Sequence, residues 1–255
     1  MSGRAALVLA CLLTSCAEAA AMVGGAAPAP PELARHVVLI VGSRGNSCTG
    51  TAIARDLVLT AAHCVLAGAD YKLVDYDAMH QPLLKDVADI ARHPQFDLNT
   101  MLAHRATADV ALLKLAAPLP VAMAPAALGT RVAAKVDEPF TVVGFGVAVR
   151  GDGRTGGTLR AARLVSTGRP GSLQLRLVDP ATRNARPGLG ACTGDSGAPV
   201  FDEAAVPRAL IGVVSWSTGP NNAGGCGGLT GVTPLARYRD WIVETARQLG
   251  SPLAP

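Results

Sequence analysis

Apolar residues occur in short runs separated by Gly, Pro, Asn and Asp over most of the chain. These runs are rich in Val, Leu and Ile, which is typical of buried strands. Six clear examples cover residues 36–41, 57–60, 110–115, 140–145, 173–178 and 210–216. Closely spaced strands separated by turn residues predict an all-β barrel or sandwich.

Two segments break this pattern. Residues 116–139 are rich in Ala and Pro, which indicates a connector between two β halves. Near the end, Thr233 can cap a helix and Pro234 suits its first position, while Gly250 is placed to end it. The pattern therefore predicts one terminal helix over about 234–249, whose apolar face holds Leu235, Tyr238, Trp241, Ile242 and Leu249.

The composition indicates a folded chain. It has 255 residues, of which 49% are hydrophobic and 16% charged, so intrinsic disorder is disfavoured. This length allows one large domain or two small ones with a sizeable core. The net charge of +4 is too mild to indicate nucleic-acid binding, and no nucleic-acid partner is predicted.

The first residues have the pattern of a targeting segment. Arg4 precedes a short apolar run over residues 5–13, as in a secretory signal peptide, and this run is too short to span a bilayer. Residues 19–21 form an A-x-A-like cleavage site, which predicts a signal peptide over 1–21. Residues 13–16 instead resemble a bacterial lipobox, which would make Cys16 a lipidated N-terminus. The protein is thus expected to be secreted or periplasmic, or a lipoprotein anchored to a membrane through Cys16.

Three later segments supply residues suited to nucleophilic catalysis. Segments 60–64, 108–115 and 194–199 contain, in order, His63, Asp109 and Ser196. A serine hydroxyl needs a base within hydrogen-bond reach, and histidine can be that base. A buried aspartate can fix the tautomer of the histidine and stabilise its protonated form.

These motifs identify the chain as similar to the trypsin-like serine proteases of the chymotrypsin fold, as a bacterial-type secreted member. The likeness runs from Met22-Val23-Gly24-Gly25 to the terminal helix. It implies an all-β protein of two packed antiparallel six-stranded β-barrels with a C-terminal α-helix. The implied protease domain covers 22–250, with barrels over about 22–120 and 135–232 and the helix over about 234–249.

The resemblance also implies the catalytic roles. His63 would act as general base and then as general acid, Asp109 would orient it, and Ser196 would attack the scissile carbonyl. The backbone N–H groups of Gly194 and Ser196 would form the oxyanion hole, where glycine allows the chain to turn its N–H inward.

Substrate-binding residues follow from the same resemblance. Ser215 would lie beside the catalytic aspartate, and Ser215, Trp216 and Ser217 would pair with the substrate backbone. Gly190, six residues before Ser196, would lie at the base of the specificity pocket, with Ser217 and Gly231 on its walls. Because trypsins need an acid at the base, we expect a small or medium uncharged P1 residue.

Activation and disulfides complete the expected site. In relatives the freed α-amino group at the position of Met22 pairs with the aspartate before the catalytic serine, here Asp195. Four cysteines match family disulfides, as Cys48–Cys64 and Cys192–Cys226. Their thiols lack the paired C-x-x-C spacing of zinc sites, and no metal or cofactor is predicted.

Two other classes are disfavoured by the residues. An α/β-hydrolase esterase needs Gly-x-Ser-x-Gly and the chain order Ser, Asp, His, whereas Ala198 follows Ser196 by two and the order here is His, Asp, Ser. An inactive binding protein on this fold would usually have lost a catalytic residue. The expected partners are a polypeptide substrate and a protein inhibitor, with the chain a monomer.

Overall fold

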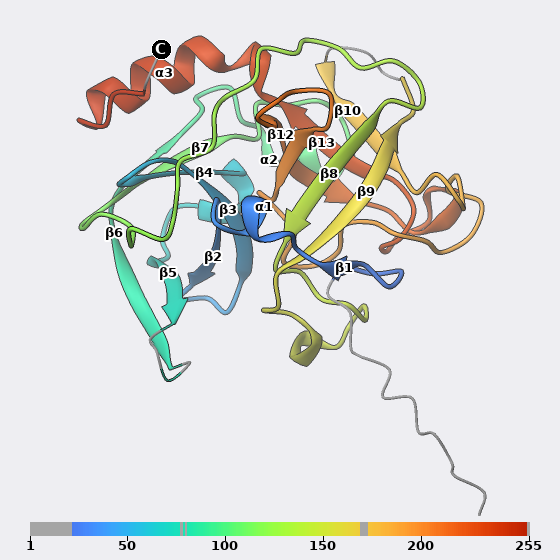
Figure 1. The fold of residues 1–255 in the computed structure, drawn as a ribbon, viewed down its shortest axis with the longest axis horizontal. Helices are drawn as coiled ribbons and strands as arrows, with labels where there is room; N and C mark the ends of the chain where they lie inside the picture. Colours follow the sequence, from blue (N-terminus) through green and yellow to red (C-terminus); the bar gives the residue numbers. More distant parts are fainter. Residues whose placement is uncertain (1–21, 77–78, 80, 169–172, 254–255) are drawn as a thin grey trace, which may run out of the picture.

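A computed structural model describes residues 22–76, 79, 81–168 and 173–253. The expected signal peptide, 1–21, with Cys16, lies outside these described residues. Two β-barrels lie next to each other, and the terminal helix lies at one edge of the molecule (Figure 1). Short apolar runs alternate with turns, so each barrel is built from short antiparallel strands.

The first barrel is a closed ring of six strands in the order β2-β3-β4-β7-β6-β5. All neighbouring pairs are antiparallel. Its core includes the buried side chains of Ile40, Val58, Leu73 and Leu113. The strands are β2 (Val37–Gly42), β3 (Ser47–Ala54), β4 (Leu57–Thr60), β5 (Tyr71–Tyr76), β6 (Pro82–Arg92) and β7 (Ala111–Leu115).

The second barrel also closes with six strands. Its sheet has the order β9-β10-β13-β12-β11-β8, and the β8–β9 pairing closes the ring. A short strand, β1 (Ala27–Pro28), pairs with the outside of β9. The ring contains β8 (Pro139–Gly144), β9 (Arg160–Ser166), β10 (Leu175–Val178), β11 (Pro199–Asp202), β12 (Ala209–Ser217) and β13 (Thr230–Pro234). The prediction of two antiparallel six-stranded barrels with a C-terminal helix is thus confirmed.

Helices are few and short. The α-helices are α1 (Pro31–Ala34), α2 (Leu98–Leu102) and α3 (Arg239–Gln248), and the 3₁₀ turns are η1 (Ala62–Val65), η2 (Gly153–Thr155), η4 (Pro220–Asn222) and η5 (Leu235–Arg237). Within the described part of the chain, no helix has both the length and the apolar character needed to cross a membrane.

The terminal helix begins later than its sequence pattern predicts. Thr233 and Pro234 lie in β13, paired with β12, so their backbone is held extended and cannot start a helix. A 3₁₀ turn follows, and the α-helix covers Arg239–Gln248 rather than 234–249. Gly250 terminates the helix, as predicted. Gly250 has a φ of +72°, and the Ser251 N–H donates to Ala246 O at 2.9 Å. This is a Schellman-type end, for which glycine is suited.

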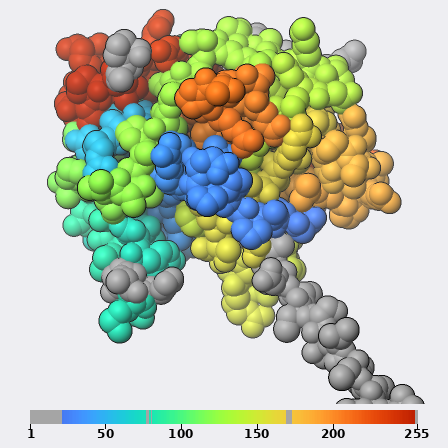
Figure 2. Space-filling model, in the orientation of Figure 1, coloured from blue at the N-terminus to red at the C-terminus, as the bar shows by residue number. Residues whose placement is uncertain are grey.

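Apolar packing sets how the two barrels meet. One buried cluster combines Leu59 of the first barrel, Val213 of the second and Ile242 of α3. Helix α3 contacts β7, so the last element of the chain packs on the first barrel (Figure 1). In Figure 2 the β5–β6 hairpin and the segment between β8 and β9 project as separate lobes from one side. The predicted catalytic residues come from both barrels, so this cluster helps to fix their relative placement.

Candidate active site

His63 and Asp109 are in direct contact. His63 lies in η1, just after β4, and Asp109 lies just before β7, which pairs with β4. The Nδ1 atom of His63 is 2.8 Å from Oδ2 of Asp109, and the His63 main-chain N–H donates to Oδ1 at 3.0 Å. With Nδ1 as the donor, Nε2 keeps a free lone pair and can accept a proton.

Asp109 has a further partner from the second barrel. Its side chain is fully buried, and the Ser215 hydroxyl donates to Oδ2 at 2.5 Å. Burying a carboxylate is costly unless donors surround it. The two groups of His63 and the Ser215 hydroxyl supply those donors, so Asp109 is held in one orientation.

Main-chain contacts with the first barrel hold Ser196 in place. Its carbonyl accepts from the Thr49 N–H at 2.8 Å, and Thr49 follows Cys48, whose disulfide reaches Cys64 beside His63. The next residue, Gly197, has a φ of +78°, and a Cβ there would lie 2.1 Å from Thr60 Oγ1. Ser196 Oγ forms no hydrogen bond with a described residue. Contacts of a serine with its base are often long in the absence of substrate.

The turn around Ser196 presents free donors. Neither the Gly194 N–H nor the Ser196 N–H donates to a described residue, whereas the Gly194 carbonyl accepts from Thr49 Oγ1 at 2.8 Å. Gly194 has a φ of +95°, which side chains rarely adopt, and a Cβ would lie 2.9 Å from the Cα of Gly146. This backbone needs glycine. Two unpaired N–H groups in one turn can bind a developing oxyanion.

Asp195 is fully buried beneath this turn. Its carboxylate accepts from the N–H groups of Gly146 and Cys192, both at 2.9 Å. Burial raises the pKa of Asp195 to about 7, although the two N–H bonds oppose that shift. Gly144 lies between Asp195 and the end of the buried Met22 side chain. A Cβ on Gly144 would be 2.3 Å from Asp195 Oδ1 and 3.2 Å from Met22 Cε, so these two groups are close together. None of the ion pairs between described residues involves Asp195.

The predicted pocket residues are only partly brought together. Gly190 forms an antiparallel bridge with Val23. A Cβ on Gly190 would lie 3.3 Å from Gly227 Cα and 3.5 Å from Thr230 Oγ1, so these two residues are its neighbours in space. The Thr230 hydroxyl also accepts from the Ala191 N–H at 3.1 Å. Gly231 contacts Trp216 instead, since a Cβ there would lie 2.0 Å from the indole. The structure thus puts Gly227 and Thr230, rather than Gly231, beside Gly190, because Gly231 is paired with Trp216 in the β12–β13 ladder.

Trp216 is enclosed by residues for which no sequence motif predicts a role in the site. His104 stacks on the indole, with ring centres 4.6 Å apart and planes at 16°. The guanidinium of Arg176 lies 5.5 Å from the ring centre. The indole Nε1 is buried without a hydrogen-bond partner among the described residues. Nothing in the local sequence of His104 or Arg176 indicates this contact, which depends on the placement of α2 and β10.

Both expected disulfides are present. Cys48 and Cys64 are joined, as are Cys192 and Cys226, with Cα separations of 6.1 Å and 5.1 Å. Cys48, His63 and Cys64 are close enough together to suggest a metal site, but the two sulfurs are bonded to each other and are not thiolate ligands.

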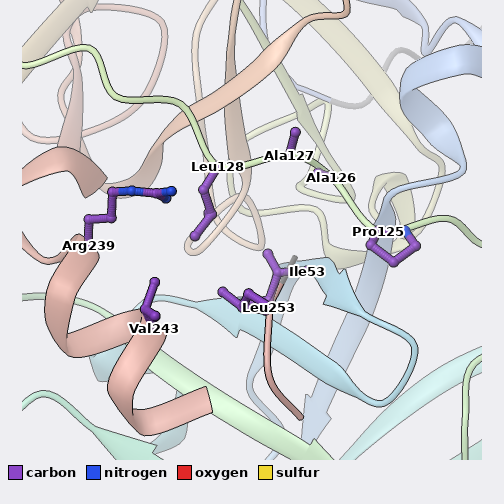
Figure 3. Close-up of a pocket in the computed structure, with 8 residues that line it drawn as sticks. All are labelled: Ile53, Pro125, Ala126, Ala127, Leu128, Arg239, Val243 and Leu253. Atoms are coloured by element: carbon purple, nitrogen blue, oxygen red, sulfur yellow. The ribbon is translucent and has the colours of Figure 1, made fainter. Parts of the chain in front are cut away.

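A separate apolar pocket lies away from these residues (Figure 3). It is formed by β3, the connector between the barrels and the start of α3, and Arg239 points across it. None of the predicted site residues lines it, so the chemistry is not assigned to this pocket. Its lining is Ile53, Pro125, Ala126, Ala127, Leu128, Arg239, Val243 and Leu253.

Comparisons with known proteins agree with this geometry. The family model described as Trypsin matches residues 22–242. The chain is 30% identical over 233 residues to a vitellin-degrading protease of Bombyx mori, covering 85% of this chain and 82% of that protein. It is 31% identical over 259 residues to scolexin B of Heliothis virescens, covering 89% and 84%.

A solved structure shares the fold. Neuropsin, a serine protease expressed in the limbic system of mouse brain, superposes with a TM-score of 0.67 at 22% identity, covering 88% of this chain and 99% of that one. The family match and the similar proteases define the chain as a serine-type endopeptidase, a hydrolase that acts on polypeptides. The chain belongs to the trypsin family of serine proteases. The relatives quoted are insect and mammalian, and they give no support to a bacterial-type member.

Proposed function

We propose that this chain hydrolyses peptide bonds through a His63–Asp109–Ser196 triad and an acyl-enzyme intermediate. The observation that carries the proposal is the buried Asp109 carboxylate, which contacts both the ring and the main chain of His63. A buried carboxylate in this position makes Nδ1 the protonated nitrogen and leaves Nε2 as the base.

The steps follow from these contacts. Nε2 of His63 takes the Ser196 hydroxyl proton as Oγ attacks the scissile carbonyl, and the resulting oxyanion is bound by the N–H groups of Gly194 and Ser196. His63 then gives its proton to the leaving amine, which leaves an acyl group on Oγ. A water molecule, deprotonated by His63, attacks the acyl group, and the acid product leaves as the proton returns to Ser196.

Substrate binding is proposed on β12. Residues 215–217 would add a substrate strand to the sheet edge. Gly190, with Gly227 and Thr230 beside it, offers no charge at the base of the pocket. This favours a small or medium uncharged P1 side chain, with Ser217 on the wall, over the Arg or Lys that trypsins cleave after.

Activation is proposed to need a free N-terminus at Met22. The buried Asp195 carboxylate has no cation to balance it within the described residues, and Met22 Cε lies close to it. A freed α-amino group of Met22 would supply that charge and order the turn that holds Gly194. Signal peptidase cleavage after Ala21 would create this N-terminus directly, whereas lipidation at Cys16 would leave Met22 blocked until a further cut.

The remaining proposals concern the whole protein. Residues 22–250 would form the protease domain, released from the cytoplasm as a monomer after removal of residues 1–21. The two disulfides are consistent with an oxidising compartment. A protein inhibitor that occupies the substrate strand position would be a further partner.

Labelling by a fluorophosphonate tests the proposed function. The expected result is one covalent adduct on Ser196 in a chain that begins at Met22, its loss in Ser196→Ala, and strong reduction in His63→Ala. A panel of peptides with different P1 residues then defines the specificity. An unlabelled Ser196 in correctly folded protein would support an inactive binding protein instead.

A further inference from the structure

Three residues form a row across adjacent strands beside the proposed substrate strand. Arg176 of β10 lies opposite Gly231 of β13, and Gly231 lies opposite Trp216 of β12. Because Gly231 has no side chain, the guanidinium carbon of Arg176 comes within 5.5 Å of the centre of the Trp216 ring. This row places a cation next to the segment 215–217.

The charge of Arg176 is not balanced by a carboxylate among the described residues. Its Nε donates to the neutral Gln174 Oε1 at 3.2 Å, and its side chain is only partly buried. A guanidinium has five donors, so its terminal N–H groups can still bind a ligand carboxylate in a bidentate pair. Contact with an aromatic ring does not use those donors.

A second guanidinium lies at the other end of the same segment. Arg150 Nη1 donates to the Gly224 carbonyl at 3.0 Å, and a Cβ on Gly225 would lie 2.9 Å from that nitrogen. The Gly225 carbonyl in turn accepts from the Ser217 hydroxyl at 3.3 Å. Arg150 likewise has no carboxylate partner within the part of the chain that the structure describes.

Two buried acidic groups of this region already have hydrogen-bond partners. Asp109 is bound by His63 and Ser215, and the Asp179 carboxylate accepts from the N–H groups of Ala181 and Leu189. The uncharged base at Gly190 adds no negative charge. Segment 215–217 therefore has two arginines near it that have no carboxylate partner among the described residues.

We propose that this protease prefers polypeptides with Asp or Glu at the residues that pair with 215–217, and that Arg176 is the main specificity determinant, with Arg150 as the second. The inference rests on the proposed function, since it names the substrate class of that site. An acidic side chain on the added strand would supply the missing carboxylate, while a Lys at the same position would be repelled.

Matched peptides test this preference. An internally quenched peptide is made with Asp, Asn or Lys at each of the three positions on either side of one scissile bond. At low salt, Asp is expected to exceed Asn about two- to five-fold in kcat/KM at a paired position, with Lys below Asn. At 1 M NaCl, where the screening length is about 3 Å, the ratio should approach one.

Three variants test whether Arg176 and Arg150 cause the preference for acidic residues. The Asp/Asn ratio is compared in Arg176→Gln, Arg150→Gln and Arg208→Gln, the last an exposed arginine in the β11–β12 connection. The ratio should fall most in Arg176→Gln and stay unchanged in Arg208→Gln. Because each ratio compares two peptides on one protein, a variant with lower overall activity remains informative.

Two outcomes would overturn the inference. One is equal cleavage of Asp and Asn peptides at every position, and the other is a preference that Arg176→Gln and Arg150→Gln both keep. Failure of the proposed function looks different, because then no peptide is cleaved and the fluorophosphonate does not label Ser196.

Discussion

Thr49 of the first barrel holds Ser196 of the second, through a hydrogen bond of 2.8 Å from its main-chain N–H to the Ser196 carbonyl. The Thr49 hydroxyl donates to the Gly194 carbonyl and accepts from the Phe145 N–H at 3.1 Å. A single buried residue on β3 thus contacts both ends of the turn whose N–H groups we propose as the oxyanion hole.

Removal of the Thr49 hydroxyl should therefore lower catalysis without touching the triad. In Thr49→Val the Gly194 carbonyl and the Phe145 N–H lose a partner, which should cost about 1–3 kcal/mol of stability. A shifted Gly194 N–H should reduce kcat by roughly ten- to a hundred-fold. Steady-state kinetics and urea unfolding measure the two effects. Thr49→Ser, which keeps the hydroxyl, is the control, and full activity of Thr49→Val would contradict the role.

Ser215 should support Asp109 in a similar way. The variant Ser215→Ala removes one donor from a fully buried carboxylate, and a hydrogen bond to a charged group contributes about 1.5–3 kcal/mol. We expect kcat to fall about ten-fold or more, with little change in the amount of folded protein. Ile211→Val, four residues earlier on β12 and outside the proposed site, controls for changes in the strand. Equal kcat in both variants would argue against this support.

The local pattern predicted an all-β barrel or sandwich, whereas the two six-stranded barrels and the disulfide pairs were expected from the resemblance to trypsin-like proteases. Alternating apolar runs and turns define the strands, and cysteines next to the catalytic motifs pair as expected. The predicted start of the terminal helix was wrong because Thr233 and Pro234 pair with β12 as part of β13. A helix-capping pattern depends only on neighbouring residues, so it does not indicate that these residues pair with another strand.

Site residues could be predicted from the sequence only where they lie within a recognisable motif. His63 and Asp109 are in contact as expected, while Gly231 packs on Trp216 rather than beside Gly190. The long connection before Cys226 obscures the register of the two strands that flank it. The roles of His104 and Arg176 depend on contacts between distant elements, for which the chain has no local signal.

His104 should control the exposure of Trp216. The chain has two tryptophans, and His104→Ala would uncover the one at the site, so the fluorescence emission should shift to longer wavelength. A mobile indole should bind the substrate strand less well, which raises KM more than it lowers kcat. His104→Phe keeps an aromatic ring to stack and should behave like the parent protein. An unchanged spectrum and KM in His104→Ala would show that the stacking has no such role.

The pH dependence of stability should reveal whether Met22 is free. In a chain extended before Met22, the Asp195 pKa is raised by burial to about 7, so the folded state binds more protons than the unfolded state between about pH 4 and 7. Stability should then fall as pH rises through that window, by up to about 1.4 kcal/mol per pH unit.

A chain that begins at Met22 should lose stability in a different, more alkaline pH window. Its amine would balance the Asp195 carboxylate, and the folded pKa of that amine would exceed its unfolded value of about 8. The stabilisation is then fully present below pH 8 and is lost as pH rises through the folded pKa. Urea unfolding of both chains from pH 4 to 10 measures this, and Asp195→Asn should remove both dependences. Identical profiles for the two chains would exclude the buried amine–carboxylate pair, because only one of them has an amine at Met22.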